Sequence, residues 1–245
     1  MAATLYSLAL SHPALAAHRM LEVKRIDHRV VNLLPGLHPV PLRLAGFPGP
    51  TVPALVLDGR RIQGSREISR ALDELSPTPR LFPEAAERRG EVEAAERWGE
   101  EVLQAVPRRI FRWLTANRLE ARRWLAAEHV RIPGSTLLAR SSLQARAFAR
   151  AVGASDEAVR RDIAELKTLL SRVSSLREKG IIGGPEVNAA DFQIASSVRA
   201  LGLFTDLAPL IADHPAVSYA RELFPDFPAG PPPLLPPEWL TPLRG

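Results

Sequence analysis

The chain has 245 residues, of which 46% are hydrophobic and 24% charged, and its formal net charge is +5. That size and apolar content allow one large domain or two small ones with their own cores. The sequence contains no cysteine, which excludes disulfides, cysteine-bound metals and a protein thiol as nucleophile. It also lacks a membrane-length apolar run and a secretory signal pattern, so we expect a soluble, cytoplasmic protein without membrane contact.

The positive charge is nearly all arginine, since the chain has only three lysines. Arginine and glutamate alternate at helical spacing in several segments, which is typical of solvated, salt-bridged helix faces. The densest basic groups are Arg108, Arg109, Arg112 and Arg118, Arg122, Arg123. They lack the aromatic pattern of a nucleic-acid site, so we expect no nucleic-acid partner. The weaker hypothesis of such binding requires an affinity that falls steeply as salt rises.

The N-terminal third begins with a strand–helix–strand pattern. Residues 4–10 form an apolar run with the length of a buried strand, 13–24 place apolar residues on one helical side, and 28–33 follow as a second strand. This order predicts a right-handed parallel unit. Residues 35–50 contain five prolines, which predicts an irregular or mobile loop with at most a short turn at 41–45.

Residues 51–75 read as strand, tight turn, short strand and helix. Val52-Pro53 opens the first strand, because proline belongs at the start of a strand or at a bend. Asp58-Gly59 is a strong two-residue hairpin signal. Ser65 stands where a helix over 65–75 begins, as its N-cap. The free amides of such a helix start are a natural seat for a small carboxylate.

From residue 84 onward the pattern is helical alone. Helices are predicted near 84–116, 117–128, 137–151, 155–178, 188–202, 206–212 and 214–223. Pro107 should kink or divide the first of them. We therefore predict an α/β domain at 1–76, a linker at 77–83, an all-α domain at 84–223 and a proline-rich tail at 224–245. The tail should pack as an extended strip or be partly disordered.

A capping box marks the start of the helix predicted near 188. Asn188 as the cap and Asp191 three residues later can satisfy each other's end amides. The residues that follow are nearly all apolar, so this helix should be buried. The pair therefore has a folding role and no catalytic duty.

Val52-Pro53, Ser65 and the Asn188–Asp191 box, in this order and at this separation, resemble the glutathione S-transferase superfamily. The resemblance implies a thioredoxin-like βαβ–ββα domain followed by an all-α domain. In that family the Val-Pro peptide is cis, and the backbone of the residue before the proline pairs with the cysteinyl part of glutathione. The serine at the following helix start holds the γ-glutamyl carboxylate. These roles are carried to Val52, Pro53 and Ser65.

The residues before Ser65 depart from the family pattern. The family usually has Glu or Gln directly before that serine, whereas this chain has Gly64, with Gln63 one place early. Alternation along a strand would point Gln63 to the other face. We include both residues in the predicted glutathione-binding segment.

The resemblance places the reactive position at the end of the first strand. Ser11 aligns with the catalytic cysteine of the omega-like and glutaredoxin-like members, which this first-helix motif resembles most. A hydroxyl cannot perform thiol–disulfide exchange, but it can donate a hydrogen bond to a glutathione thiolate. The alternative is that Ser11 is a plain helix N-cap without a ligand.

Three other side chains are weaker candidates. His12 is an alternative proton acceptor, although we expect a partly exposed first-turn residue. Tyr6 is an alternative catalyst, but it matches the structural Leu-Tyr of many bacterial members, so we interpret it as core or cleft wall. Trp98 is the best candidate for an electrophile pocket, although aromatic residues at helical spacing are more often core. The histidines lack metal-ligand spacing, so we expect no metal.

The sequence therefore predicts a glutathione S-transferase-like enzyme that joins the glutathione thiolate to a small hydrophobic electrophile. Glutathione would be a co-substrate, with no bound cofactor. The family usually dimerises, so we expect a homodimer. The alternative is a non-catalytic protein of the same fold that binds a ligand or a protein, which the missing cysteine and Gly64 favour.

Overall fold

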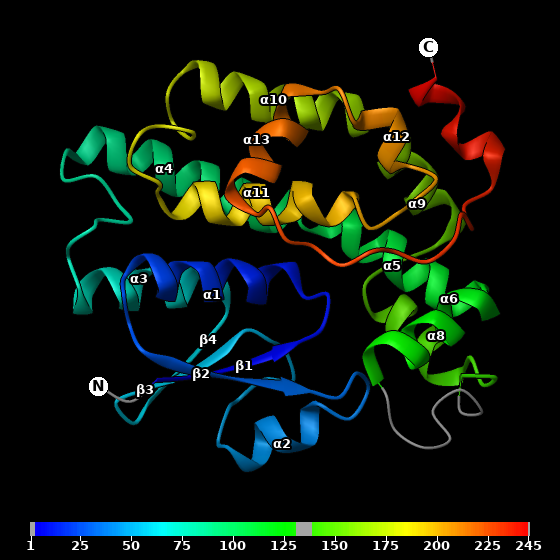
Figure 1. Ribbon diagram of the computed structural model, residues 1–245, viewed down its shortest axis with the longest axis horizontal. Helices are drawn as coiled ribbons and strands as arrows, with labels where there is room; N and C mark the ends of the chain where they lie inside the picture. The colour runs from blue at the N-terminus through cyan, green and yellow to red at the C-terminus, as the bar shows by residue number, and fades with distance from the viewer. Residues whose placement is uncertain (1–2, 131–138, 245) are drawn as a thin grey trace. The chain divides into compact units, whose positions relative to one another are not determined.

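The computed structural model describes residues 3–130 and 139–244 (Figure 1). The chain divides by its contacts into two compact units. Residues 1–101 and 175–197 form the first, which we call the N-terminal unit, and residues 102–174 and 198–245 form the second, the C-terminal unit. The predicted linker at 77–83 is thus inside the N-terminal unit, and the domain limits proposed from sequence remain a prediction.

The N-terminal unit is built on a four-stranded mixed sheet of order β2-β1-β3-β4. Its strands are β1 (Ala3–Leu8), β2 (His28–Leu33), β3 (Ala54–Leu57) and β4 (Arg60–Gln63). Strand β1 pairs in parallel with β2 and antiparallel with β3, and β3 forms the hairpin with β4. The predicted strand–helix–strand unit and the following hairpin are confirmed.

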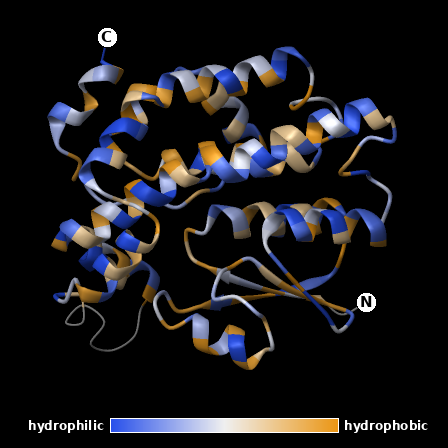
Figure 2. Ribbon diagram, turned by 180° about the vertical axis from the view of Figure 1, so that it is seen from behind, coloured by the Kyte–Doolittle hydropathy of each residue, from blue (hydrophilic) through white to orange (hydrophobic). Residues whose placement is uncertain are grey.

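Helices cover both faces of this sheet (Figure 1). Helix α1 (His12–Val23) and helix α3 (Ser65–Leu75) lie on one face, and the short helix α2 (Pro39–Leu44) lies on the other. Helix α1 buries alanines together with Met20 and Leu21, which lets it pack closely on the sheet. Hydrophobic and hydrophilic residues alternate along these helices, as their amphipathic packing requires (Figure 2).

Helix α2 corrects the prediction of an irregular loop at 35–50. Pro39 and Pro41 lie in its first turn, where the missing amide hydrogens have no intrahelical acceptor anyway. Leu42 is fully buried and packs with Phe47 and Ala54. The prolines therefore lie at the start of a helix, and the buried Leu42 fixes α2 to the sheet.

The N-terminal unit also contains helix α4 (Ala86–Trp98) and residues 189–197 of helix α11 (Ala189–Leu201). The predicted capping box is confirmed at the start of α11. Asn188 Oδ1 accepts from the amides of Ala190 and Asp191, at 3.0 and 3.2 Å, while Asp191 Oδ2 accepts from the Asn188 amide at 2.8 Å. Asp191 Oδ1 accepts a further bond from Gly183 N at 2.6 Å.

The C-terminal unit is helical where the structure describes it. It comprises α5 (Ala105–Asn117), α6 (Leu119–Leu125), α8 (Leu143–Ala151), α9 (Asp156–Ala164), most of α10 (Leu166–Glu178), the end of α11, α12 (Ala208–Ile211) and α13 (Pro215–Leu223). Pro107 lies in the first turn of α5, and the long predicted helix is divided before it, at a π-helical turn over Gly99–Leu103. The predicted helix near 155–178 is two helices. The prediction over 137–151 lies partly outside the described residues.

Residues 224–236 of the proline-rich tail have no helix or strand, as an extended strip would, whereas the end of the tail differs from that expectation. A 3₁₀ helix over Pro237–Leu243 ends it, and Trp239, Leu240 and Leu243 are buried there. Trp239 packs against Trp113 of α5, with ring centroids 4.7 Å apart. These apolar side chains explain why the tail folds back onto the C-terminal unit.

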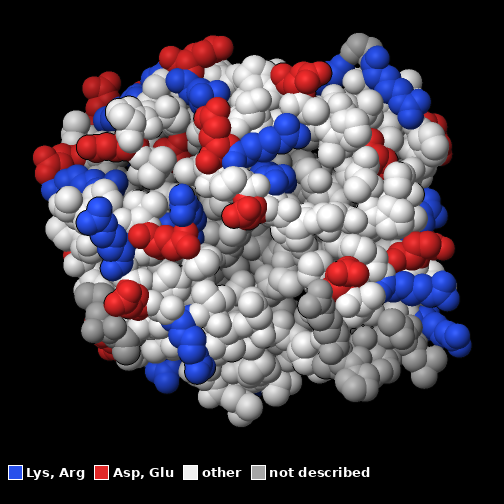
Figure 3. Space-filling view, in the orientation of Figure 1, with Lys and Arg blue, Asp and Glu red and all other residues white. Residues whose placement is uncertain are grey.

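Acidic and basic side chains lie beside one another on the surface, as the sequence pattern predicts (Figure 3). Several are helical pairs three or four residues apart, such as Arg89 with Glu93 at 3.0 Å and Arg88 with Glu91 at 2.7 Å. Within residues 3–130 and 139–244, none of the helices is both long and apolar enough to cross a membrane.

Candidate functional site

Ser11 lies directly after β1 and is the N-cap of α1. Its Oγ accepts from the Ala14 amide at 3.4 Å, and its own amide donates to the Leu8 carbonyl at 3.0 Å. A hydroxyl that accepts a bond from the backbone keeps its single proton for another partner. The first turn of α1 contains no acidic residue, so the positive end of the helix dipole is not neutralised there. This position therefore suits a negatively charged sulfur.

His12 is buried, which corrects the expectation of a partly exposed residue. Its Nδ1 lies 3.3 Å from Ser197 Oγ, and that hydroxyl donates to the Gln193 carbonyl at 3.0 Å. Because a serine has one proton, this geometry fits a His12 tautomer that donates from Nδ1 to Ser197. His12 thus connects α1 to α11 and does not face an open site.

Tyr6 of β1 packs edge-to-face on Phe47, with centroids 5.6 Å apart. Both rings belong to the apolar cluster that also holds Leu42 and Ala54. This placement agrees with the interpretation of Tyr6 as part of a core wall.

The Val52-Pro53 peptide is cis. Val52 lies just before β3 and packs against the cluster around Leu42 and Phe47. The Pro53 carbonyl accepts from the Gly64 amide at 3.0 Å, which ties the start of β3 to the start of α3. Val52, Pro53 and the first turn of α3 are thereby held as one backbone platform.

Gln63 ends β4 directly before Gly64, and its side chain binds a loop. Its Nε2 donates to the carbonyls of Gly49 and Thr51, at 2.9 and 2.6 Å, and its Oε1 accepts from Gly49 N at 2.9 Å. Both amide protons are therefore used. Gln63 fixes the 49–51 loop beside the cis peptide, and its direct contact to glutathione stays a prediction.

Gly64 is the N-cap of α3, which moves the cap one residue from the prediction at Ser65. Its backbone φ is +101°, a conformation that residues other than glycine rarely adopt. A Cβ atom placed on Gly64 would meet no other atom within 4 Å. The backbone conformation therefore explains why glycine stands where the family has an acid or amide. It also leaves open space in front of the first turn of α3.

Ser65 is buried, and its Oγ donates to Gln193 Oε1 of α11 at 2.8 Å. The Ser65 hydroxyl proton, which a glutamyl carboxylate would accept, is therefore already donated to Gln193. Sequence reasoning missed Gln193, although a glutamine inside the apolar run of α11 was the available signal. Gly99 enables the contact, since a Cβ there would lie 2.9 Å from Ile194 Cγ1 and 3.1 Å from Gln193 Cγ.

The comparisons with known proteins bear on the fold. Residues 5–80 match the family described as the glutathione S-transferase N-terminal domain. A glutathione S-transferase from Rhodospirillum rubrum F11 is 20% identical and superposes with a TM-score of 0.62 over 98% of this chain and 99% of that chain. The chain has the glutathione S-transferase fold.

Two further solved structures also superpose on this chain over nearly their whole length. The β-etherase LigF from Sphingobium sp. strain SYK-6 is 18% identical, with a TM-score of 0.60 over 100% of this chain and 99% of that chain. FzlA from C. crescentus is 16% identical, with a TM-score of 0.58 over 99% of each chain. No curated protein sequence matches the chain. At these identities the similarity shows the fold alone.

Trp98 ends α4 and is 8% exposed. So little exposed surface offers an electrophile almost no contact, which favours the interpretation of Trp98 as core. In this glutathione S-transferase fold the assignment of Trp98 to an electrophile pocket therefore stays a prediction without support from its burial.

Glu96 is a buried carboxylate that the sequence did not reveal. It accepts from Ser69 Oγ at 2.7 Å and from Arg70 Nη1 at 2.8 Å, both on α3. Burial raises the pKa of Glu96, and the bonds from Ser69 and Arg70 oppose that rise. The Glu96 carboxylate thus connects α4 to α3 and helps to hold α3 in place.

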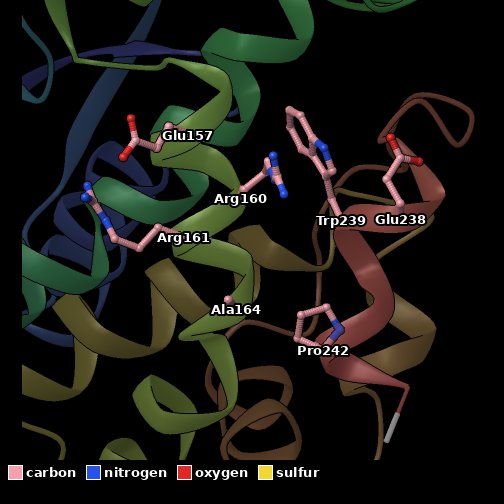
Figure 4. A pocket seen from close by; sticks show the side chains of 7 residues that line it. All are labelled: Glu157, Arg160, Arg161, Ala164, Glu238, Trp239 and Pro242. Atoms are coloured by element: carbon pink, nitrogen blue, oxygen red, sulfur yellow. The ribbon is translucent and has the colours of Figure 1, made fainter.

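Two surface hollows lie in the C-terminal unit. One, of about 450 Å³, is lined by α9 and the 3₁₀ helix. Figure 4 shows Arg160 beside the Trp239 indole, whereas Glu157 and Arg161 point elsewhere. The other, of about 550 Å³, lies along α8 and the start of α9. Within the described part of the chain, no cluster of three His, Asp or Glu side chains is placed to hold a metal.

Proposed function

We propose that this chain is a glutathione S-transferase-type enzyme that conjugates the glutathione thiolate to a hydrophobic electrophile. The fold and the match of residues 5–80 support glutathione as the co-substrate. The observation that carries the catalytic step is the position of Ser11, which caps α1 and still has a proton to donate.

In this proposal Ser11 donates its hydroxyl hydrogen to the sulfur of glutathione. A hydrogen bond to the charged form lowers the pKa of a thiol, and the uncompensated start of α1 acts in the same direction. The thiolate then attacks the electrophile, the new S–C bond forms, and the leaving group departs with its electron pair. Ser11 remains chemically unchanged.

The tripeptide would lie along the backbone platform. The main chain of Val52 would pair with its cysteinyl part, next to the cis peptide. The γ-glutamyl carboxylate would bind the first-turn amides of α3, in the space that Gly64 leaves open. This differs from the family pattern, because the Ser65 hydroxyl is engaged with Gln193.

A matched pair of serine variants tests the catalytic step. Ser155 caps α9 as Ser11 caps α1, with its Oγ accepting from Ala158 N at 3.1 Å. Ser11→Ala and Ser155→Ala should each lose a helix cap, worth about 1 kcal/mol of stability. Only Ser11→Ala should lower the rate with an activated aryl chloride and glutathione, by about 10-fold or more. Equal rates in the two variants would contradict the proposal.

A non-catalytic protein of the same fold is the second candidate. The observation that favours it is the bond from Ser65 to Gln193, which occupies the hydroxyl that the family uses for glutathione. Calorimetric titration of glutathione into the wild type separates the two candidates. Saturable binding supports the transferase, whereas no binding at millimolar glutathione supports the non-catalytic protein. The proposal also includes a homodimer, which light scattering of the full chain checks.

A further inference from the structure

The guanidinium of Arg112, on α5, is held by two phenylalanine rings. Its Cζ lies 4.8 Å from the ring centroid of Phe148 on α8 and 5.9 Å from that of Phe111. All three residues belong to the C-terminal unit. Rings at these distances attract the cation through their π faces and restrict where its side chain can turn.

Three arginines near Arg112 in the sequence have oxygen partners, and among the described residues Arg112 has none. Arg109 forms a bidentate pair with Asp162, with both N···O distances 2.6 Å. Arg118 donates to the Leu234 carbonyl at 3.0 Å. Arg122 donates to backbone carbonyls, among them that of Thr115 at 2.9 Å. Among the residues that the structure describes, neither a carboxylate nor a carbonyl oxygen accepts from Arg112.

The electrostatic surroundings of Arg112 are also unfavourable for a cation. Burial lowers the pKa of Arg112, and the positive charge of Arg108 lowers it further. A partly buried charge normally has an opposite charge or hydrogen-bond acceptors close by. Among the described residues, the two aromatic rings are the protein groups found to favour this cation, and no carboxylate contributes to its electrostatics.

We propose that Arg112 anchors a binding site for a small organic oxyanion, with an aromatic carboxylate as the best-fitting class. A guanidinium presents paired N–H groups along its edge, which match the two oxygens of a carboxylate or phosphate. Phe111 and Phe148 add apolar surface beside that edge, which favours a ligand with its own ring. Arg108 supplies a second positive charge nearby. This site is independent of the proposed glutathione site, since it needs no residue of the N-terminal unit.

The experiment titrates benzoate, acetate and inorganic phosphate separately into the full chain at constant ionic strength, followed by calorimetry. Benzoate should bind saturably and more tightly than acetate, because only benzoate has a ring. If phosphate binds more tightly than benzoate, the ligand is a phosphate and the aromatic assignment is wrong. If none of the three binds, the whole proposal is overturned.

Variants connect the binding to Arg112. Arg112→Gln should weaken benzoate at least 10-fold, whereas Arg123→Gln, which removes an exposed arginine of α6, should change it less than twofold. If Arg112→Gln and Arg123→Gln weaken benzoate binding equally, the net positive charge of the protein attracts the anion, and the proposed site at Arg112 is wrong. Arg112→Lys keeps the charge and the long stem but loses the paired N–H geometry, so it should also weaken benzoate, by about threefold. If Arg112→Gln does not fold, Arg112→Lys takes its place in the benzoate titration. Ser11→Ala should leave benzoate binding unchanged, which separates this site from the glutathione proposal.

Discussion

The hydroxyl of Ser65 donates a hydrogen bond to Oε1 of Gln193, at 2.8 Å, and joins the first residue of α3 to the middle of α11. Both side chains are buried. A buried serine hydroxyl needs a partner, because an unpaired one bears the full cost of desolvation. In this chain an internal glutamine supplies the partner, so the serine that the family uses for a ligand is part of the packing between α3 and α11.

A double-mutant cycle should show this coupling. Ser65→Ala and Gln193→Met should each reduce the free energy of unfolding by about 1–3 kcal/mol, because each leaves the other side chain without this bond. The double variant should be destabilised by at least about 0.5 kcal/mol less than the sum of the two, since the second change removes nothing further from the pair. Urea unfolding of the four proteins measures it. Strictly additive changes would show that the bond contributes no coupling.

Gly90 inside α4 and Gly99 directly after it should respond in opposite directions to alanine. Gly99 has no room for a Cβ, since Ile194 Cγ1 would lie 2.9 Å away, so Gly99→Ala should cost about 1–3 kcal/mol. Gly90 lies inside α4 with open space around it, so Gly90→Ala should stabilise by about 0.5–1 kcal/mol through helix propensity. Thermal unfolding of both variants distinguishes the effects. If both variants are destabilised, the segment formed by α4 and the following π-helical turn is sensitive to any substitution.

The sequence predicted those elements whose cause is local. The turn at Asp58-Gly59, the helix start near Ser65 and the box at Asn188 and Asp191 depend on a few adjacent residues, and the structure contains all of them. The sequence does not predict helix α2 although its signal is local, because proline both breaks helices and fits the first turn of one, and proline density alone does not distinguish the two.

The partners of the candidate site residues were beyond sequence reasoning, because they lie far away along the chain. Ser65 meets Gln193 and His12 meets Ser197 only once α11 packs against α3 and α1. A polar residue in an apolar run indicates that some buried partner exists, but its identity follows from the tertiary arrangement. The same holds for Arg112, which has no oxygen partner among the described residues, whereas Arg109 and Arg118 have theirs.

The capping box should be essential for stability. Asp191 accepts from Asn188 N at 2.8 Å and from Gly183 N at 2.6 Å, and it is fully buried. Asp191→Ala removes both acceptors, so we expect a loss of about 3 kcal/mol or more in the free energy of unfolding. Ser155→Ala, which removes a cap at the exposed start of α9, should cost only about 1 kcal/mol. A similar loss in both, measured by urea unfolding, would show that the box is an ordinary cap.

Glu96 should give the stability of the protein a specific dependence on pH. Burial raises its pKa in the folded state above the ordinary value of 4.5, so the folded protein holds this proton at a pH where the unfolded chain has lost it. The stability that Glu96 contributes is therefore complete below the unfolded pKa and is lost as pH rises through the folded pKa.

Glu96→Gln keeps the size of the side chain and cannot ionise. The wild type should thus lose stability relative to this variant as pH rises above the ordinary value of 4.5, when both are unfolded with urea. Glu91→Gln, an exposed position of the same helix, controls for the loss of one charge and should show a smaller change. A wild-type advantage that grows with pH would mean that Arg70 and Ser69 outweigh the burial of Glu96.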